Sequence, residues 1–304
     1  MNPGLNLIEK DIINKICNSL DSVGILYRIF SRTKDSKSIA EKIVRKIQEN
    51  KPYSENGKKM QDIIGIRIVT YFQDDIYLVK EILSHNFNYI DEEIDTPDLT
   101  VFKPKRTNII CQFDEENTKK LTESIAVSND ENLKFCDSTF ELQLRTILSE
   151  GWHEIDHSLR YKCKEDWTNH SEKERLLNGV YANLEVNDLA MKALFIELSY
   201  NHFKERNWEA MLRNKFRLKF QLIPLSDEIK SILDNDNDLA KKILKLDRED
   251  VLSKIYKIGL SLPINFNNLI YMINAIFIRN AEINNLTPEL IQNYTQQRIG
   301  EMAV

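Results

Sequence analysis

Polar side chains alternate with apolar ones over residues 140–146, and the polar members are Glu141, Gln143 and Arg145. Because successive side chains of a β-strand point to opposite faces of a sheet, this pattern predicts a strand with one face in a core. The other face then presents a carboxylate, an amide and a guanidinium together. Such a set can bind a charged ligand and move a proton.

A helix with one polar side is predicted directly after this strand, over residues 151–162. Trp152, Ile155 and Leu159 recur at helical spacing, while His157 and Arg160 lie among the polar residues. A polar strand face that leads into a polar helix favours a cleft for a charged ligand. The alternative is an ordinary solvent-facing edge strand, which is the commoner meaning of alternation. Here two adjacent segments converge on one place, and this favours the cleft.

The same helix contains His153-Glu154-Ile155-Asp156-His157, which matches the HExxH pattern of zinc proteases. Two histidines four residues apart share a helix face and can bind Zn²⁺ together with a third protein ligand. No glutamate downstream lies in a recognisable third-ligand motif. Asp156 also places a charge inside a motif that usually lies in an apolar helix. The sequence therefore disfavours zinc proteolysis.

Basic residues concentrate in one part of an acidic chain. Residues 31–59 carry nine Lys or Arg against four Asp or Glu, a balance of 9 − 4 = +5, whereas the whole chain has a formal charge of −5. The pattern predicts a strand over 24–30, a turn over 31–37 and a helix over about 36–48. Such a junction offers backbone N–H groups and the positive end of a helix to phosphate. Four side chains can converge there: Arg32, Lys34, Ser38 and Lys42.

The alternative for this basic segment is a solvated, lysine-rich helix face, which is more common in general. The next strand, predicted over residues 60–72, is apolar on both faces except for Asp62, Gly65 and Arg67. A carboxylate at the mouth of a central strand suits Mg²⁺, which takes one or two carboxylates plus phosphate oxygens. Alternatively, Asp62 caps the preceding turn and Arg67 pairs with a structural acid.

The composition indicates an ordered and mostly helical protein, because 304 residues include only eight glycines and seven prolines. The four cysteines have no paired spacing, so the sequence suggests neither a disulfide framework nor a zinc cluster. No apolar run approaches the length of a membrane span. The sequence predicts a soluble cytoplasmic protein with no membrane partner, and from about residue 171 onward it predicts helices.

Four motifs occur in an order that resembles the RelA/SpoT synthetase domain, most of all the short, single-domain alarmone synthetases and their toxin relatives. They are Arg32-x-Lys34-x-x-x-Ser38-x-x-x-Lys42, Asp62-Ile63-Ile64-Gly65-Ile66-Arg67, Phe140 to Thr146, and Trp152 to Lys162. The resemblance covers roughly residues 20–165. It implies an α+β fold, with a nucleotidyltransferase-like mixed β-sheet flanked by helices and an all-helical C-terminal region. The expected domains are a synthetase domain over residues 1–168 and a helical region of unknown role over residues 169–304.

By this resemblance the protein is an enzyme that transfers the β,γ-pyrophosphate of ATP to the 3′-hydroxyl of a nucleotide, with GDP or GTP favoured and Mg²⁺ required. The residues implied to bind ATP are Arg32, Lys34, Ser38, Lys42, Arg145 and Lys162. The residues implied to be catalytic are Asp62, Glu141, Arg67 and Gln143, and Asp62 and Glu141 are also the implied Mg²⁺ ligands. This transfer needs positive charge on the phosphates and an aligned hydroxyl, with little covalent chemistry from the protein.

The chain departs from the family where the acceptor base is expected to stack. The family's Gly-Tyr-x-Ser-x-His element is replaced by residues 102–108, which contain no Gly-Tyr pair and no histidine. Phe102 or Tyr89 is a candidate for stacking. The further candidates for contact with the acceptor are Arg106, Asn108 and His157.

Three functions therefore stay open beside the guanosine alarmone synthetase. One is a toxin-type enzyme that pyrophosphorylates the 3′ end of tRNA and holds RNA through basic residues, among them Lys103, Lys105, Arg106 and the strip 215–219. Another is an enzyme with an adenine nucleotide acceptor that makes a (p)ppApp-like product. The third is a catalytically silent nucleotide sensor, against which the two carboxylates argue. A homo-oligomer is compatible with the sequence.

Overall fold

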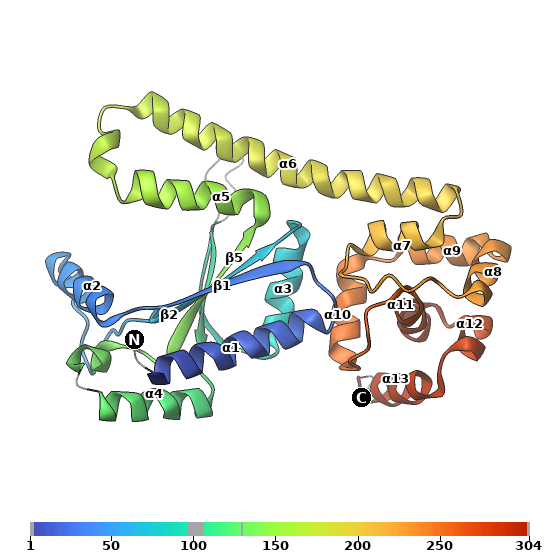
Figure 1. The fold of residues 1–304 in the computed structure, drawn as a ribbon, viewed down its shortest axis with the longest axis horizontal. Helices are drawn as coiled ribbons and strands as arrows, with labels where there is room; N and C mark the ends of the chain where they lie inside the picture. Colours follow the sequence, from blue (N-terminus) through green and yellow to red (C-terminus); the bar gives the residue numbers. More distant parts are fainter. Residues whose placement is uncertain (1–2, 96–105, 129, 303–304) are drawn as a thin grey trace. The chain divides into compact units, whose positions relative to one another are not determined.

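The computed structural model describes residues 3–95, 106–128 and 130–302. Its central element is a five-stranded mixed sheet with the order β1-β2-β5-β4-β3. The β2–β5 pair is parallel, and the other three pairs are antiparallel. The strands are β1 (Tyr27–Thr33), β2 (Ile64–Thr70), β3 (Tyr89–Ile94), β4 (Thr107–Gln112) and β5 (Thr139–Thr146) (Figure 1).

The register of the three strands β1, β2 and β5 aligns the polar residues in rows across the sheet. Because side chains alternate between the two faces of each strand, aligned residues of one parity share a face. Two neighbouring rows lie on the same face: Arg32, Gly65 and Glu141 in one, and Phe30, Arg67 and Gln143 in the other. The hydrogen-bond register thus brings together residues up to 109 positions apart in sequence, from Arg32 to Glu141.

On β2 and β5, the side chains of the opposite parity are mostly apolar and form the core. Ile64, Ile66 and Ile68 of β2 are fully buried, and so is Phe140 of β5. The Phe140 ring meets the Phe87 ring edge-on, with the centroids 5.2 Å apart. This burial, worth about 1.5–3 kcal/mol for each large apolar side chain, fixes which face of the sheet remains polar.

Helix α1 (Pro3–Asp21) and helix α4 (Glu115–Val127) lie side by side in Figure 1, and two ion pairs join them or their ends. Lys15 pairs with Asp114, which is the N-cap of α4, and Lys120 pairs with Asp11. These partly exposed pairs orient the helices more than they stabilise them, because exposed ion pairs contribute little.

Two further helices begin where strands or turns of the polar face end. Asp35 caps α2 (Ser36–Gln48), and its side chain accepts a hydrogen bond from the Ser38 N–H. Thr146, the last residue of β5, is the N-cap of α5 (Ile147–Ile155) and forms a capping box with Ser149. Strand β5 therefore runs straight into helix α5. A wide π-helical turn, η2 (Asp156–Tyr161), continues α5.

The chain divides into two compact units, one formed by Met1–Cys17, Tyr27–Tyr71 and Leu83–Val186, the other by Asn18–Leu26, Phe72–Ile82 and Asn187–Val304. The first contains the sheet. The remaining elements are α3 (Asp74–Ser84), η1 (Glu131–Phe135), η3 (Lys164–Trp167), α6 (Ser171–Lys204), α7 (Trp208–Phe216), α8 (Asp227–Asn235), α9 (Asn237–Lys245), α10 (Arg248–Ile258), α11 (Phe266–Ile273), η4 (Asn274–Ile278), α12 (Ala281–Leu286) and α13 (Glu289–Met302).

The second unit is helical and contains two buried ion pairs. Arg217 Nη2 lies 2.5 Å from Asp74 Oδ2, and Arg248 Nη1 lies 2.6 Å from Asp75 Oδ1. All four side chains are at most 5% exposed. Removal of one partner would leave an uncompensated buried charge, so these pairs fix the packing of their helices.

The predicted fold class is confirmed: a mixed sheet flanked by helices, followed by a helical C-terminal region. The domain boundary at residue 168 stays a prediction. Strand β1 begins and ends three residues later than the strand predicted over 24–30. Arg32, which was predicted to lie in a turn, therefore projects from the sheet itself. Within the described ranges, no helix is both long and apolar enough to cross a membrane.

Candidate active site

A cavity of about 1170 Å³ lies over the polar face of β1, β2 and β5. Strand residues form its floor, α2 forms one wall, and α5 with the turn after it forms the other. The lining residues are Phe30, Ser31, Arg32, Lys34, Ser38, Glu41, Lys42, Arg45, Gly65, Ile66, Arg67, Glu141, Gln143, Glu150, Glu154, His157, Ser158 and Lys162. Typical ligand pockets measure about 300–1,000 Å³, so this cavity has room for more than one nucleotide-sized group.

Nine of the predicted site residues meet in this cavity: Arg32, Lys34, Ser38, Lys42, Arg67, Glu141, Gln143, His157 and Lys162. They come from four segments of the chain. The strand register accounts for those on β1, β2 and β5, and the one-turn spacing on α2 accounts for Ser38 and Lys42. The cleft predicted between the strand over 140–146 and the helix after it is present, because Glu141, Gln143, His157 and Lys162 line the same cavity. The roles of the nine residues stay predictions.

Asp62 lies just before β2 and holds the two lysines of the cavity wall. Its Oδ2 atom is 2.8 Å from Lys34 Nζ and 2.5 Å from Lys42 Nζ. Burial opposes the negative charge, but the two ammonium groups outweigh it and hold the pKa of Asp62 below its usual range. Among the residues that the structure describes, Asp62 Oδ1 is buried without a hydrogen-bond partner.

Lys34 is partly desolvated in this cluster, with a side chain that is 21% exposed. Burial lowers the pKa of Lys34 from its usual 10.5, and the charge and hydrogen bond of Asp62 offset only part of that effect. The Lys34 ammonium also donates to the Asp62 carbonyl oxygen at 2.5 Å. A partly desolvated ammonium gains more from a phosphate than a fully hydrated one does, because electrostatic attraction strengthens as water is excluded.

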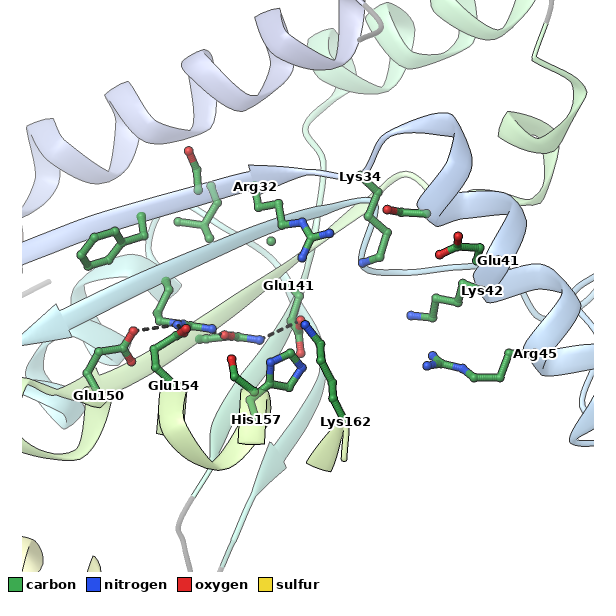
Figure 2. Close-up of a pocket in the computed structure, with 18 residues that line it drawn as sticks. Arg32, Lys34, Glu41, Lys42, Arg45, Glu141, Glu150, Glu154, His157 and Lys162 are labelled. Atoms are coloured by element: carbon green, nitrogen blue, oxygen red, sulfur yellow. Dashed lines mark hydrogen bonds and ion pairs between the residues drawn. The ribbon is translucent and has the colours of Figure 1, made fainter. Parts of the chain in front are cut away.

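The cavity is divided by charge. Figure 2 shows Lys42 and Arg45 pointing into it from α2, with His157 and Lys162 across from them and Glu150 and Glu154 at the far end. One end is therefore cationic and the other acidic. The cationic end suits a polyphosphate, and the acidic end repels one.

A chain of hydrogen bonds runs from the acidic end to Glu141. Arg67 Nη1 donates to Glu150 Oε1 at 2.6 Å and also to Glu154 Oε1. Arg67 Nε donates to Gln143 Oε1 at 3.0 Å, and Gln143 Nε2 donates to Glu141 Oε2 at 3.0 Å (Figure 2). Hydrogen bonds from Arg67 lower the pKa of Glu154.

Four predicted residues of the described ranges lie outside the cavity lining: Asp62, whose contacts are given above, and Arg145, Asn108 and Arg106. Arg145 is 7% exposed, and its Nη2 donates to Asn108 Oδ1 at 3.0 Å. Burial, with the nearby charge of Arg67, lowers the pKa of Arg145 to about 10, so it stays charged at neutral pH. Arg106 pairs with Asp95 at 3.0 Å. Arg145, Asn108 and Arg106 are thus engaged by local partners, and their contact with a nucleotide stays a prediction.

Phe102, the proposed stacking residue, lies outside the described residues. Tyr89 begins β3 and is not part of the cavity lining. The aromatic residue that does line the cavity is Phe30, which is 53% exposed on β1. It shares the parity of Arg32 on β1, but the sequence placed Arg32 in a turn, so that parity was not available to identify Phe30.

Sequence reasoning also missed charged residues on both helices. Arg45 lies seven positions after Ser38, which places it on the same face of α2. Glu150 and Glu154 are separated by one helical turn on α5 and face Arg67. The HExxH histidines face different surroundings: His153 lies against the Trp152 and Tyr181 rings, whereas His157 lines the cavity.

Gly65 lies between Arg32 and Glu141 on the floor and provides a test of where a ligand binds. A Cβ at this position would meet nothing closer than the Arg32 carbonyl oxygen at 3.9 Å. Gly65→Val should therefore keep its thermal unfolding midpoint, since β-branched residues suit strands. Its side chain would fill the cavity floor and should weaken ATP binding about tenfold or more in calorimetric titration. Gly65→Ala, which adds a smaller side chain, is the control. If Gly65→Val bound ATP with wild-type affinity, ATP would have to bind elsewhere.

Residues 31–166 match the region found in RelA / SpoT proteins. The chain is 30% identical over 141 residues to the GTP pyrophosphokinase YjbM of Bacillus subtilis (strain 168). That match covers 44% of this chain and 56% of YjbM, so the similarity spans little more than half of the relative.

Solved structures of small alarmone synthetases are also similar to this chain. The small alarmone synthetase 1 of Bacillus subtilis bound to its product pppGpp is 22% identical, with a TM-score of 0.44, over 63% of this chain and 92% of that one. The same enzyme bound to AMPCPP is 24% identical, with a TM-score of 0.40, over 63% and 91% of the two chains.

Proposed function

We propose that this protein is an ATP-dependent pyrophosphokinase that transfers the β,γ-pyrophosphate of ATP to the 3′-hydroxyl of a nucleotide. The observation that carries the proposal is the convergence of Lys34, Lys42 and Glu141 in one cavity of the RelA/SpoT segment. A cationic wall and a carboxylate on the floor are what a transfer to a hydroxyl needs.

The division of charge gives ATP one orientation. Its triphosphate lies along Lys34, Lys42 and Arg45, because these supply positive charge from one wall. Its adenine lies toward Phe30, where the exposed ring offers a stacking surface worth about 1–3 kcal/mol. The reverse orientation would place the triphosphate against Glu150 and Glu154, which repel it.

In the proposed reaction the 3′-oxygen of the acceptor attacks the β-phosphorus of ATP. The bond between the β-phosphorus and the oxygen bridging to the α-phosphate breaks, and AMP leaves with that oxygen and its electron pair. Glu141 takes the proton of the hydroxyl. Lys34, Lys42 and Lys162 offset the negative charge of the transferred group.

The residues present fit the Mg²⁺ that the resemblance implies. Asp62 Oδ1 is a buried carboxylate oxygen without a hydrogen-bond partner in the described part of the chain, and the carboxylate of Glu141 lines the cavity nearby. Asp62 and Glu141 would hold the ion together with phosphate oxygens, since Mg²⁺ uses one or two carboxylates in nucleotide sites. Bound there, it would supply positive charge to the β- and γ-phosphates.

The guanine nucleotides GDP and GTP are the favoured acceptors, by resemblance to the family and to YjbM, a GTP pyrophosphokinase. The tRNA alternative loses part of its support in the strip 215–219, because Arg217 is buried in its ion pair with Asp74. Lys103 and Lys105 lie outside the described residues.

The acceptor is identified by supplying γ-labelled ATP and Mg²⁺ with GDP, GTP, ADP, AMP or bulk tRNA in separate reactions and resolving the products by charge. We expect transfer to a mononucleotide, with guanine preferred. Transfer to tRNA alone, falling steeply with added salt, would support the toxin-type reaction instead. Binding of ATP without transfer to any acceptor would support the silent sensor.

A further inference from the structure

Glu150 and Glu154 take no part in the bond changes proposed above, yet both contact the chain of hydrogen bonds that ends at Glu141. We propose that they are positioning residues that act through Arg67 and Gln143 to fix the Glu141 carboxylate for proton transfer. This inference rests on the proposed function, in which Glu141 accepts the proton of the acceptor hydroxyl.

The Gln143 amide is the link whose orientation matters most. An amide group has an acceptor oxygen on one side and a donor NH₂ on the other. Because Arg67 Nε donates to Gln143 Oε1 at 3.0 Å, the NH₂ group faces Glu141 and donates to its Oε2 at 3.0 Å. A rotated amide would present its oxygen to the carboxylate and repel it. Arg67 thus orients the Gln143 amide so that its NH₂ group holds Glu141 Oε2. The other carboxylate oxygen, Glu141 Oε1, then accepts the proton of the acceptor hydroxyl.

The two glutamates keep Arg67 in this position. A guanidinium on the floor of a cavity that binds a polyphosphate would otherwise turn to the phosphates, for which it has a strong bidentate preference. Glu150 and Glu154 lie one turn apart on α5 and bind the same Nη1 nitrogen. Burial opposes the charge of Arg67, but its hydrogen bonds to Glu154 and Glu150 outweigh burial and raise its pKa.

The formal charge of this group of three is −2 + 1 = −1. Phosphate is therefore repelled from Arg67, and its Nε remains bound to Gln143. Arg67 was predicted from the sequence to be catalytic. Its contacts instead give it a positioning role, in which it touches the residue that orients the proposed base.

The double variant Glu150→Gln/Glu154→Gln tests this role, because the amides keep the size of the side chains and remove both charges. We expect kcat to fall about 10- to 100-fold, as small misplacements of reacting groups do. ATP should bind as tightly as in the wild type or more tightly, because the repulsion is gone and Arg67 is free to meet phosphate. If the two glutamates had only a structural role, their replacement would lower kcat and weaken ATP binding together. Glu172→Gln, in the exposed first turn of α6, is the matched control.

A combined variant tests whether Glu150 and Glu154 act on Glu141 through Gln143. In a Gln143→Leu background, adding Glu150→Gln/Glu154→Gln should change kcat less than about twofold, because the residue through which they act is already gone. Losses that multiply in the combined variant would overturn the inference.

The Gln143 side-chain NH₂ resonances give a readout that does not depend on activity. They are identified by their absence in Gln143→Leu, and they should shift in Glu150→Gln/Glu154→Gln but not in Glu172→Gln. Unshifted resonances would overturn the inference even if the protein transfers pyrophosphate. Shifted resonances in a protein that transfers to no acceptor would reject the proposed function and leave the hydrogen-bond relay in place.

Discussion

Asp62→Asn and Glu141→Gln should each lower turnover at least ~100-fold, the effect of removing one strong electrostatic contact to a transition state. Glu141 is the proposed base, and a glutamine cannot take the hydroxyl proton. Asp62 carries the buried carboxylate oxygen that fits the metal. Both substitutions keep the shape of the side chain, so no cavity is left, and thermal unfolding should show a folded protein at the assay temperature.

The Asp62→Asn variant has a second expected property that distinguishes lost chemistry from lost binding. In the free protein Asp62 neutralises Lys34 and Lys42 and so competes with the phosphates for them. Metal-free ATP should therefore bind to Asp62→Asn as tightly as to the wild type or more tightly. Turnover near the wild-type value in Asp62→Asn or Glu141→Gln would remove that carboxylate from the proposed site.

Lys34→Ala and Lys42→Ala should each weaken ATP binding about 10- to 100-fold, since a hydrogen bond to a charged group contributes roughly 1.5–3 kcal/mol. Both ammonium groups lie on the wall of the cavity and are only about one-fifth exposed, at 21% and 18%. Acceptor affinity should change much less. Isothermal titration with ATP and then with the acceptor separates the two effects.

Lys37→Ala is the matched control for these lysines. Lys37 lies on the same helix as Lys42, but its side chain is 86% exposed and pairs only loosely with Glu41, at 3.9 Å. The Lys37→Ala variant should bind ATP within about twofold of the wild-type affinity, as expected for an exposed charge that does not contact the ligand. Unchanged ATP affinity in both Lys34→Ala and Lys42→Ala would mean that the basic segment is only a solvated helix face.

The sequence predicted the elements of the site better than their contacts. Alternation over residues 140–146 identified the strand and the face of Glu141 and Gln143 correctly, because one face of that strand is packed in the core. The same alternation also selected Arg145. Parity tells which face a side chain takes, but it cannot show that Asn108 of the neighbouring strand binds the guanidinium and that the end of the strand is covered.

The missing residues depended on information that a single sequence does not contain. Phe30 and Arg67 become neighbours through the antiparallel register of β1 and β2, and that register is set by tertiary packing. Glu154 was visible as a polar residue of the helix predicted over 151–162, whereas Glu150 lies one residue before that range. Their role follows only from the direction of α5, which Thr146 fixes by capping the helix at the end of β5. Neither the register nor the direction has a local signature.

The reaction class is tested most directly by parallel reactions with α-labelled and γ-labelled ATP, Mg²⁺ and the accepted nucleotide. Pyrophosphate transfer predicts AMP from the α-labelled ATP and, in equal amount, an acceptor product that carries the γ-label and two additional phosphates. Formation of ADP with a singly phosphorylated acceptor would indicate an ordinary kinase. Appearance of the α-label on the acceptor with release of free pyrophosphate would indicate a nucleotidyltransferase, and either result would contradict the pyrophosphokinase.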